Sequence, residues 1–331
     1  MRRGNTRSHS ELGSQALQRQ WYFVLRHGRV GHCQAIKFQM KNHIVITGGA
    51  GFVGSHLIEL LLKKTQKKII SLDNYSSGSK KNHIKNIRVK YLNVNTSEIE
   101  KNLSNYKNKI HSLFHFGEFA RIFQSFKNFD RCFKSNSIGT QAVFKFCLDN
   151  KIKLIYSATS ASLGNNGQDK NLSPYAFTKS KNLELLENLK KWFNFKFEII
   201  YFYNVYGQRH IKSGEMATVI GIFENQYNKK KPLTIVRPGT QTRRFTHILD
   251  TVNTCYQAWK KNKCVHYSIS HKKSYSISDV AKMFKCRVKY LNPRKGERFA
   301  SSLANMSLNN KIIKKYGKIH LKDYITSFIK G

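Results

Sequence analysis

Residues 42–55 constrain the fold more than any other part of the chain, and they read Asn-His-Ile-Val-Ile-Thr-Gly-Gly-Ala-Gly-Phe-Val-Gly-Ser. Ile44, Val45 and Ile46 form a short β-branched run, which is typical of a buried parallel strand. Glycine then recurs at every third position from Gly48 to Gly54, and an apolar helical pattern begins there. A strand, a glycine turn and a helix N-terminus together form a pyrophosphate site, because the turn lets backbone approach the phosphates. Glycines alone would be a weak signal, but here the context that they need is present.

The next predicted strand indicates which dinucleotide this site would bind. Residues 68–72 form a second apolar run, and Asp73 stands at its carboxyl end. An acid at this position accepts hydrogen bonds from the adenosine ribose hydroxyls and repels a 2′-phosphate. We therefore predict that the cofactor is NAD and not NADP. The alternative, that Asp73 is an ordinary surface residue after a strand, fits the upstream glycines less well.

Length, charge and cysteine content bound the class of protein. A chain of 331 residues can hold a nucleotide-binding domain and a smaller second domain. No apolar run approaches the ~18 residues of a membrane span, and the six cysteines have no paired spacing. We therefore expect a cytoplasmic protein with reduced thiols, no metal site and no membrane partner. The net charge is +41, but lysine is spread along the whole chain and no nucleic-acid motif stands out, so we expect no nucleic-acid partner.

The first 39 residues differ in composition from the rest. They carry six Arg, one Lys and a single acid, Glu11, whereas Lys greatly exceeds Arg in the remainder. A targeting peptide, a non-native extension and a true appendage all fit this composition. The composition break favours a disordered or non-native extension over 1–39, with Met40 as the functional start.

From residue 40 onward strands and helices alternate, which predicts an α/β fold. We expect a Rossmann-like doubly wound parallel sheet with a smaller C-terminal α/β substrate domain. The expected strands are 43–47, 68–72, 88–92, 111–116, 152–157 and 197–202. The expected helices are 54–64, 136–150, 175–194, 216–228, 245–260, 276–285 and 321–330. The NAD-binding domain would cover 40–202, with 241–262 returning to it, and the nucleotide-sugar-binding domain would cover 203–240 and 263–331.

A tyrosine and a lysine form the second strong signal. Ser173 is a good N-cap and Pro174 a good first helical residue, so a helix begins here and places Tyr175 and Lys179 on one face. An ammonium beside a phenol, with a cationic nicotinamide nearby, lowers the phenol pKa from its ordinary value of about 10, so that the tyrosinate can act as a base. Thr159 follows a buried strand that delivers small hydroxyls to the carboxyl edge of the sheet, where such folds bind ligands. The alternative is an ordinary surface pair, and the neighbouring strand argues against it.

Together these motifs resemble the extended short-chain dehydrogenase/reductases that act on nucleotide sugars, the NAD-dependent epimerase/dehydratase family, and most of all its UDP-glucose 4-epimerase branch. The resemblance spans residues 41 to about 330. It is carried by 47–54, Asp73 with Asn74, His115 with Phe116, Asn136, Gly139 with Thr140, Thr159, Tyr175 with Lys179, 203–209 and 239–245.

The resemblance implies three sets of site residues. The catalytic residues would be Thr159, Tyr175 and Lys179. NAD would be bound by Gly48, Gly51, Phe52, Val53, Gly54, Asp73, Asn74, Asn93, Asn136, Tyr175 and Lys179. The nucleotide sugar would be bound by Asn204, Arg209, Arg243, Arg294 and Ser301.

The residues that follow Thr159 select the reaction within the family. Dehydratases carry Asp-Glu there and decarboxylases a nearby Glu, whereas this chain has Ser160, Ala161 and Ser162. The resemblance therefore implies epimerisation at C4 of a nucleotide hexose, with UDP as the expected nucleotide, through a 4-keto intermediate. The small Ser301 implies that N-acetylhexosamines also fit, and the family commonly dimerises through the helices at 136–150 and 175–194, so we expect a homodimer.

Glu118 is a departure from the family pattern, which has a small apolar residue there. It could form a salt bridge with Arg121 or alter the reaction. Another nucleotide-sugar dehydratase using Glu118, a 4-ketoreductase and a non-catalytic NAD-binding protein therefore remain open, although the retained Tyr175 and Lys179 argue against the last. An RNA-associated protein is supported by charge alone.

Overall fold

The structure is a computed structural model that describes residues 41–162, 169–296 and 312–331. The expectation of an extension over 1–39 lies outside the described residues, as does Ser301.

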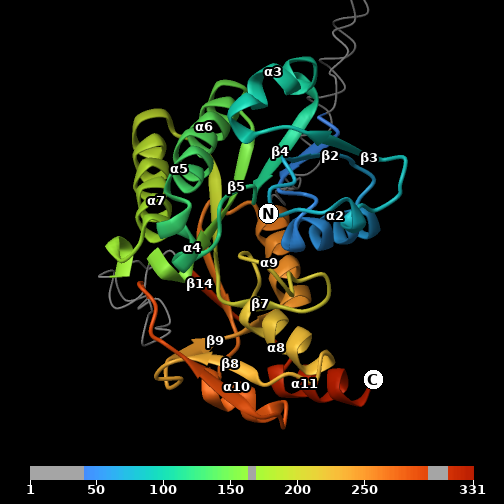
Figure 1. Ribbon diagram of the computed structural model, residues 1–331. Coiled ribbons are helices and arrows are strands. Elements are labelled where there is room, and N and C mark those ends of the chain that lie inside the picture. Colours follow the sequence, from blue (N-terminus) through green and yellow to red (C-terminus); the bar gives the residue numbers. More distant parts are fainter. Residues whose placement is uncertain (1–40, 163–168, 297–311) are drawn as a thin grey trace, which may run out of the picture. The chain divides into compact units, whose positions relative to one another are not determined.

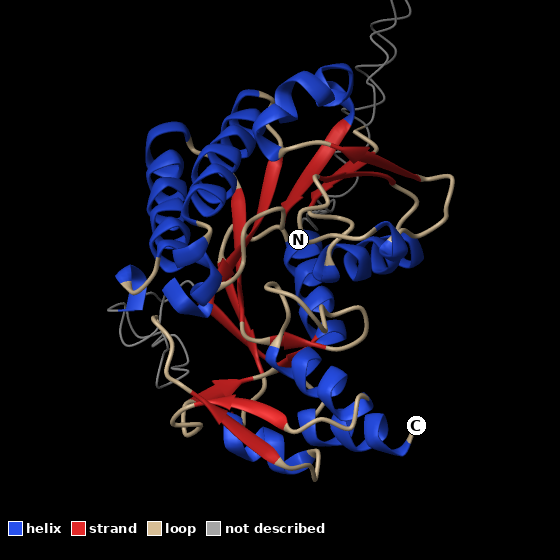
Figure 2. Ribbon diagram, viewed as in Figure 1, coloured by secondary structure: helices blue, strands red, loops and turns tan. Residues whose placement is uncertain are grey.

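The described chain is built on a parallel sheet of eight strands in the order β14-β11-β6-β5-β4-β1-β2-β3 (Figures 1 and 2). Every neighbouring pair in this sheet runs parallel. The order reverses between β1 and β4, so the predicted Rossmann-like doubly wound sheet is confirmed. The strands are β1 (His43–Thr47), β2 (Lys68–Asp73), β3 (Val89–Asn93), β4 (Ile110–His115), β5 (Lys153–Thr159), β6 (Phe197–Phe202), β11 (His266–Ser270) and β14 (Ile312–Tyr316).

Helices cover both faces of this sheet, because the strands at its centre are apolar on both sides. Helices α2 (Phe52–Lys64) and α9 (Ile248–Lys261) pack through Leu57, Leu61 and Val252 on one face. Helices α6 (Thr140–Asp149) and α7 (Pro174–Phe193) pack through Phe144 and Leu186 on the other, which is also the arrangement in Figure 1.

Local sequence sets both ends of α7, the helix that carries Tyr175 and Lys179. The Ser173 hydroxyl accepts a hydrogen bond from the Ala176 N–H, and Pro174 occupies the first turn. Asn194 ends the helix in the left-handed conformation, with φ of 52°. The predicted helix start is therefore confirmed.

A separate apolar cluster lies below the carboxyl edge of the sheet and includes Phe223, Leu233, Phe245, Phe284 and Ile325. The elements of this region are β7 (Val205–Tyr206), α8 (Val219–Asn228), β8 (Leu233–Val236), β9 (Thr242–Arg244), β10 (Thr246–His247), β12 (Ser274–Ser276), α10 (Ile277–Met283), β13 (Val288–Leu291) and α11 (Leu321–Lys330). Within the expected second domain at 263–331, however, β11 and β14 belong to the eight-stranded sheet, so this part of the domain assignment differs from the structure.

The remaining elements are short. They are α3 (Ile99–Leu103), α4 (Ile122–Lys127), α5 (Phe129–Phe133), a π-helical segment (Lys134–Gly139) that leads into α6, and 3-10 turns at Lys80–Asn82, Thr96–Glu98, Ser104–Lys109 and Ser160–Ser162. The expected helix at 136–150 thus begins as a π-helix and becomes α-helical at Thr140.

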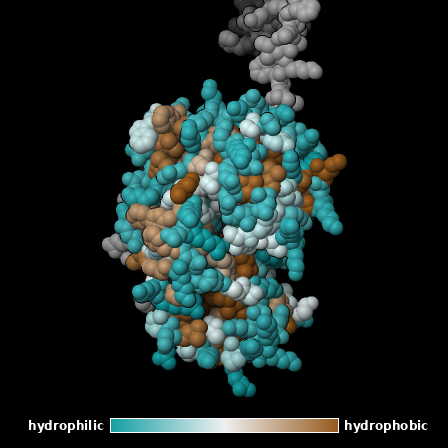
Figure 3. Space-filling model, turned by 45° about the horizontal axis from the view of Figure 1, so that its top comes forward, coloured by the Kyte–Doolittle hydropathy of each residue, from teal (hydrophilic) through white to brown (hydrophobic). Residues whose placement is uncertain are grey.

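Hydrophilic side chains dominate the face shown in Figure 3, with smaller hydrophobic areas between them. Among the described residues, no helix has both the length and the apolar character needed to cross a membrane. The five described cysteines form no disulfide with one another.

Candidate active site

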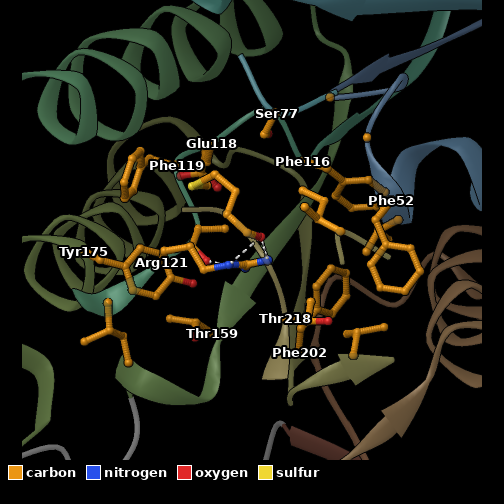
Figure 4. Close-up of a pocket in the computed structure, with 18 of the residues that line it drawn as sticks. Phe52, Ser77, Phe116, Glu118, Phe119, Arg121, Thr159, Tyr175, Phe202 and Thr218 are labelled. Carbon is orange, nitrogen blue, oxygen red and sulfur yellow. Dashed lines mark hydrogen bonds between the residues drawn. The ribbon is translucent and has the colours of Figure 1, made fainter. Parts of the chain in front are cut away.

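A cavity of about 1130 Å³ opens at the carboxyl edge of the sheet. Its walls come from the turn after β1, the ends of β2, β4, β5 and β6, the start of α7, and the region of α8 and β9 (Figure 4). Among the predicted residues, those that line it are Gly48, Gly51, Phe52, Val53, Gly54, Asp73, Asn74, Thr159, Tyr175, Lys179, Asn204, Arg243 and Arg294. The fold therefore brings most of the predicted site together where doubly wound sheets bind ligands.

The glycine turn at one end of the cavity is packed too tightly for side chains. Gly48 has φ of +71°, and a Cβ there would lie 2.8 Å from the Gly117 nitrogen. A Cβ on Gly54 would overlap the Gly48 carbonyl oxygen and lie 2.7 Å from the Gly49 Cα. No side chain caps the N-terminus of α2 at Gly51. Its backbone N–H groups thus suit a phosphate group.

The Asp73 carboxylate lines the same end of the cavity and is buried. It accepts hydrogen bonds from the backbone N–H groups of Ala50 (3.0 Å) and Tyr75 (2.8 Å). Burial raises the Asp73 pKa, and these hydrogen bonds oppose that effect. The carboxylate is thereby held against the glycine turn, with lone pairs left for a ligand hydroxyl.

Two residues predicted to bind the cofactor do not line this cavity. Asn93 pairs with Asp73 in the sheet, but the next residues, Val94 and Asn95, form the wall instead. Asn136 is fully buried behind the wall, where its side chain binds both backbone groups of Phe119. The sequence motif identified the right segments in both cases, whereas the side-chain directions depend on the packed structure.

The Tyr175 hydroxyl is hydrogen bonded to Thr159, and both side chains face the cavity in Figure 4. Burial raises the Tyr175 pKa to about 12; the Thr159 hydrogen bond and the nearby Arg121 lower it, whereas Glu118 raises it further. The expected lowering of this pKa by Lys179 is therefore wrong for the protein alone. The main reason is the burial of the phenol, and a carboxylate beside the Lys179 ammonium adds to the effect.

That carboxylate is Glu118, which forms a short ion pair with Lys179. Each of the two side chains is only 4% exposed. The Lys179 ammonium also donates to the Ser157 carbonyl and lies 4.2 Å from the centre of the Tyr156 ring. Burial lowers the Lys179 pKa, while Glu118 opposes that shift. Glu118 therefore pairs with Lys179 and not with Arg121, the partner considered from the sequence.

Arg121 is a cavity residue that the sequence did not identify as part of the site. Its Nε donates to the Met216 carbonyl at 2.9 Å, and its Nη1 donates to the Ala120 carbonyl at 2.7 Å. Figure 4 shows its guanidinium between Tyr175 and Thr218. Only the fold places this cation beside Tyr175, and no local motif signals it.

The predicted substrate residues are only partly brought together. Asn204, Arg243 and Arg294 line the cavity, and the Arg294 guanidinium lies over the Phe123 ring at 5.2 Å. Arg209 instead pairs with Glu59 of α2 and lines a second cavity, which corrects its expected position beside the substrate pyrophosphate. Ser301 is outside the described residues. Within the described ranges, no cluster of three or more His, Cys, Asp or Glu side chains could hold a metal ion.

Comparisons with known proteins agree with this geometry. The chain is 29% identical over 273 residues to a putative UDP-glucose 4-epimerase of Methanocaldococcus jannaschii, covering 77% of this chain and 87% of the relative. It is 25% identical over 267 residues to UDP-glucuronic acid decarboxylase 6 of Arabidopsis thaliana, covering 76% of each chain. The crystal structure of a UDP-glucuronic acid 4-epimerase from Bacillus cereus, with UDP-glucuronic acid and NAD, superimposes with a TM-score of 0.75 at 25% identity over 87% of this chain and 99% of that one.

The family-level comparison covers most of the chain. Residues 44–270 match the NAD dependent epimerase/dehydratase family. This range includes the glycine turn, Asp73, Thr159, Tyr175 and Lys179. The predicted family and its cofactor, NAD, are thereby confirmed, and this chain is a member of the NAD dependent epimerase/dehydratase family.

Proposed function

We propose that the chain catalyses NAD-dependent epimerisation at C4 of a UDP-hexose. The observation that carries this proposal is the meeting of Thr159, Tyr175 and Lys179 on the wall of one cavity, with the glycine turn and Asp73 at its other end. Ser160, Ala161 and Ser162, the three residues that follow Thr159, include no carboxylate for elimination of water or loss of CO₂, which favours epimerisation over the reactions of related dehydratases and decarboxylases.

The residues present fit an NAD molecule. The turn at Gly48 and Gly54 leaves no room for side chains and directs backbone toward the cavity, and Asp73 would accept hydrogen bonds from the adenosine ribose. Bound NAD supplies the hydride acceptor and donor that the reaction requires.

In the proposed mechanism Tyr175 removes the proton of the sugar 4-hydroxyl, and Thr159 stabilises the phenolate through its hydrogen bond. With NAD bound as the hydride acceptor, loss of hydride from C4 would give a 4-keto sugar, and Arg243 and Arg294 would hold its diphosphate while the sugar turns within the cavity. Hydride then returns to the opposite face of C4, and Tyr175 returns the proton. The sum is redox-neutral, so the cofactor should remain bound through turnover.

We extend the proposal to substrate range and assembly. Both UDP-hexoses and UDP-N-acetylhexosamines are proposed substrates, the second because of the small Ser301. A cytoplasmic homodimer is proposed, with α6 and α7 at its interface.

A 4-ketoreductase is the second candidate, because it would use the same Thr159, Tyr175 and Lys179 on the wall of the cavity. A protonated phenol can donate its proton to a keto oxygen, which reduction of a 4-keto sugar requires. The two candidates differ in their need for an external reductant, because only epimerisation is redox-neutral.

The test incubates purified protein, without added cofactor, with UDP-glucose and separately with UDP-GlcNAc, and follows the H4 protons by NMR. A galacto-configured product from either sugar supports the epimerase. A 4-keto-6-deoxy product would identify a dehydratase. Absence of conversion, even with NAD added, together with reduction of a UDP-4-keto sugar by NADH would identify the ketoreductase.

Replacing Thr159 by valine should shift the pH dependence of the reaction. The lost hydrogen bond raises the Tyr175 pKa, and the base must be deprotonated, so the acid limb of the kcat/KM profile moves to higher pH by about one unit. Activity near neutral pH would fall about tenfold. Thr159→Ser keeps the hydroxyl and should restore the profile; an unshifted profile in Thr159→Val would contradict this role.

Replacing Asp73 by asparagine should weaken the binding of NAD and reduce the factor by which the protein binds NAD more tightly than NADP. Loss of the charged carboxylate acceptor should lower the affinity for NAD about 10- to 100-fold. The electrostatic repulsion of the 2′-phosphate of NADP should also disappear. Titration of both cofactors against both proteins measures the two effects. Equal preference for NAD in the variant and the wild type would show that Asp73 does not face the adenosine ribose.

A further inference from the structure

Glu118 has no role in the mechanism proposed above, yet its side chain is buried beside the Lys179 ammonium at the wall of the cavity. One carboxylate oxygen, Oε2, accepts from Lys179. The other, Oε1, accepts from the Tyr156 hydroxyl at 3.0 Å, the Thr140 hydroxyl at 3.0 Å and the Asn182 amide at 3.3 Å. Four donors thus converge on two oxygens, so the Glu118 carboxyl group serves as an acceptor in each of these hydrogen bonds.

A chain of buried hydrogen bonds keeps this carboxylate in place. Thr140, which donates to Glu118, lies 2.9 Å from the His115 Nε2, and the His115 Nδ1 lies 2.6 Å from the Thr47 hydroxyl. Burial lowers the His115 pKa to about 4, so the ring is neutral near pH 7. With the proton on Nε2, the Thr47 hydroxyl donates to His115, His115 donates to Thr140, and Thr140 donates to Glu118. Lys179 donates to the other carboxylate oxygen.

The consequence is electrostatic. Without Glu118, the Lys179 ammonium would add an uncompensated positive charge near Tyr175, where Arg121 already supplies one and where the proposed function places the nicotinamide ring. With Glu118, the charge of the Glu118–Lys179 pair is zero. The nicotinamide ring is cationic when oxidised and neutral when reduced, so a nearby carboxylate favours the oxidised ring and a nearby ammonium favours the reduced one.

We propose that Glu118 is a positioning residue that cancels the charge of Lys179 and thereby biases the bound cofactor toward NAD⁺. This inference rests on the proposed function, in which Lys179 and the nicotinamide share one site. This bias would help the proposed epimerase, because the enzyme must hold oxidised cofactor between turnovers. Each 4-keto sugar that escapes before it is reduced leaves NADH on the enzyme, and that complex cannot begin a new turnover. By favouring NAD⁺, Glu118 lowers the stability of the complex that contains the 4-keto sugar and NADH, and so reduces the loss of active enzyme.

The test measures the dissociation constants of NAD⁺ and NADH, by calorimetry and by nicotinamide fluorescence, on the full-length chain. In Glu118→Gln the lost negative charge should raise the ratio of the NAD⁺ constant to the NADH constant about tenfold, or ~30 mV in the two-electron potential of the bound cofactor. Lys179→Met should move the ratio in the opposite direction, and the double variant should return it to the wild-type value.

Two further variants separate charge from structure. Glu118→Asp keeps the charge and should keep the ratio, even where both affinities fall. Glu198→Gln is the matched control, because Glu198 is a fully buried carboxylate paired with Lys153 at 3.0 Å that does not line the cavity. Its ratio should equal that of the wild type.

The outcomes distinguish this inference from the proposed function. Wild-type protein that converts UDP-sugars, together with variants whose ratio is unchanged, would overturn the role of Glu118 alone. A ratio that changes equally in Glu118→Gln and Glu198→Gln would also overturn it, because the effect would then be structural. Wild-type protein that binds neither form of the cofactor would overturn both.

Discussion

Replacing Tyr175 by phenylalanine is expected to lower the turnover number about 10³-fold while leaving the cofactor bound. The phenol is hydrogen bonded to Thr159 and can exchange a proton with the sugar 4-hydroxyl, and acid–base catalysis of this kind contributes about 10²- to 10⁴-fold. Phenylalanine keeps the packing of the ring, so binding of NAD should change little. The measurement is the initial rate by NMR with the UDP-sugar that the protein converts, together with the NAD released on denaturation.

Tyr267→Phe is the matched control for this variant. Tyr267 is fully buried in β11, its hydroxyl has no hydrogen-bond partner among the residues that the structure describes, and it does not line the cavity. The control should retain wild-type turnover. If Tyr175→Phe kept a tenth or more of wild-type activity, another base would be acting, and the Glu118 carboxylate would be the first to examine.

Local patterns predicted the elements of the fold well, because each is defined by neighbours in the sequence. The run Ile44–Val45–Ile46 and its glycine turn form the predicted strand and tight turn. Ser173 and Pro174 begin α7 as predicted, and the Tyr175 N–H adds a hydrogen bond to the distant Ser125 hydroxyl. The adjacency of β1 and β2 in the sheet follows from the βαβ unit that they form with α2.

What the sequence did not predict depends on contacts between distant segments. Strand β11 joins the large sheet beside β6 and β14 beside β11, although apolar residues within 275–286, which lie between these strands in the chain, belong to the smaller apolar cluster. The Arg209 motif is present, but Glu59, far away in the chain, holds its guanidinium outside the main cavity.

The direction of the Tyr175 pKa shift was missed for the same reason. The expectation counted the Lys179 ammonium four residues away, whereas Glu118 of a different segment neutralises it and burial then dominates. Motifs therefore located the reacting groups, and their electrostatics required the packed structure.

Replacing Gly54 by alanine is expected to reduce the affinity for NAD about 100-fold. A Cβ at this position would overlap the Gly48 carbonyl oxygen and lie 2.7 Å from the Gly49 Cα, and both are backbone atoms that cannot rotate away. The turn must therefore move, at a cost in the upper part of the ~1–3 kcal/mol typical of overpacking, which corresponds to about two orders of magnitude in binding. Because the turn is the proposed phosphate site, that displacement should appear in cofactor binding.

The measurement compares NAD content after purification and the dissociation constant for NAD with those of Gly214→Ala. Gly214 has φ of +79°, so alanine strains its backbone, but no atom of the described segments lies within 4 Å of the added Cβ, and the residue does not line the cavity. Both variants should lose thermal stability, and only Gly54→Ala should lose NAD. Equal NAD affinity in the two variants would show that the glycine turn does not bind the cofactor. Loss of NAD affinity in Gly54→Ala alone would show that cofactor binding depends on the close contact between α2 and the end of β1.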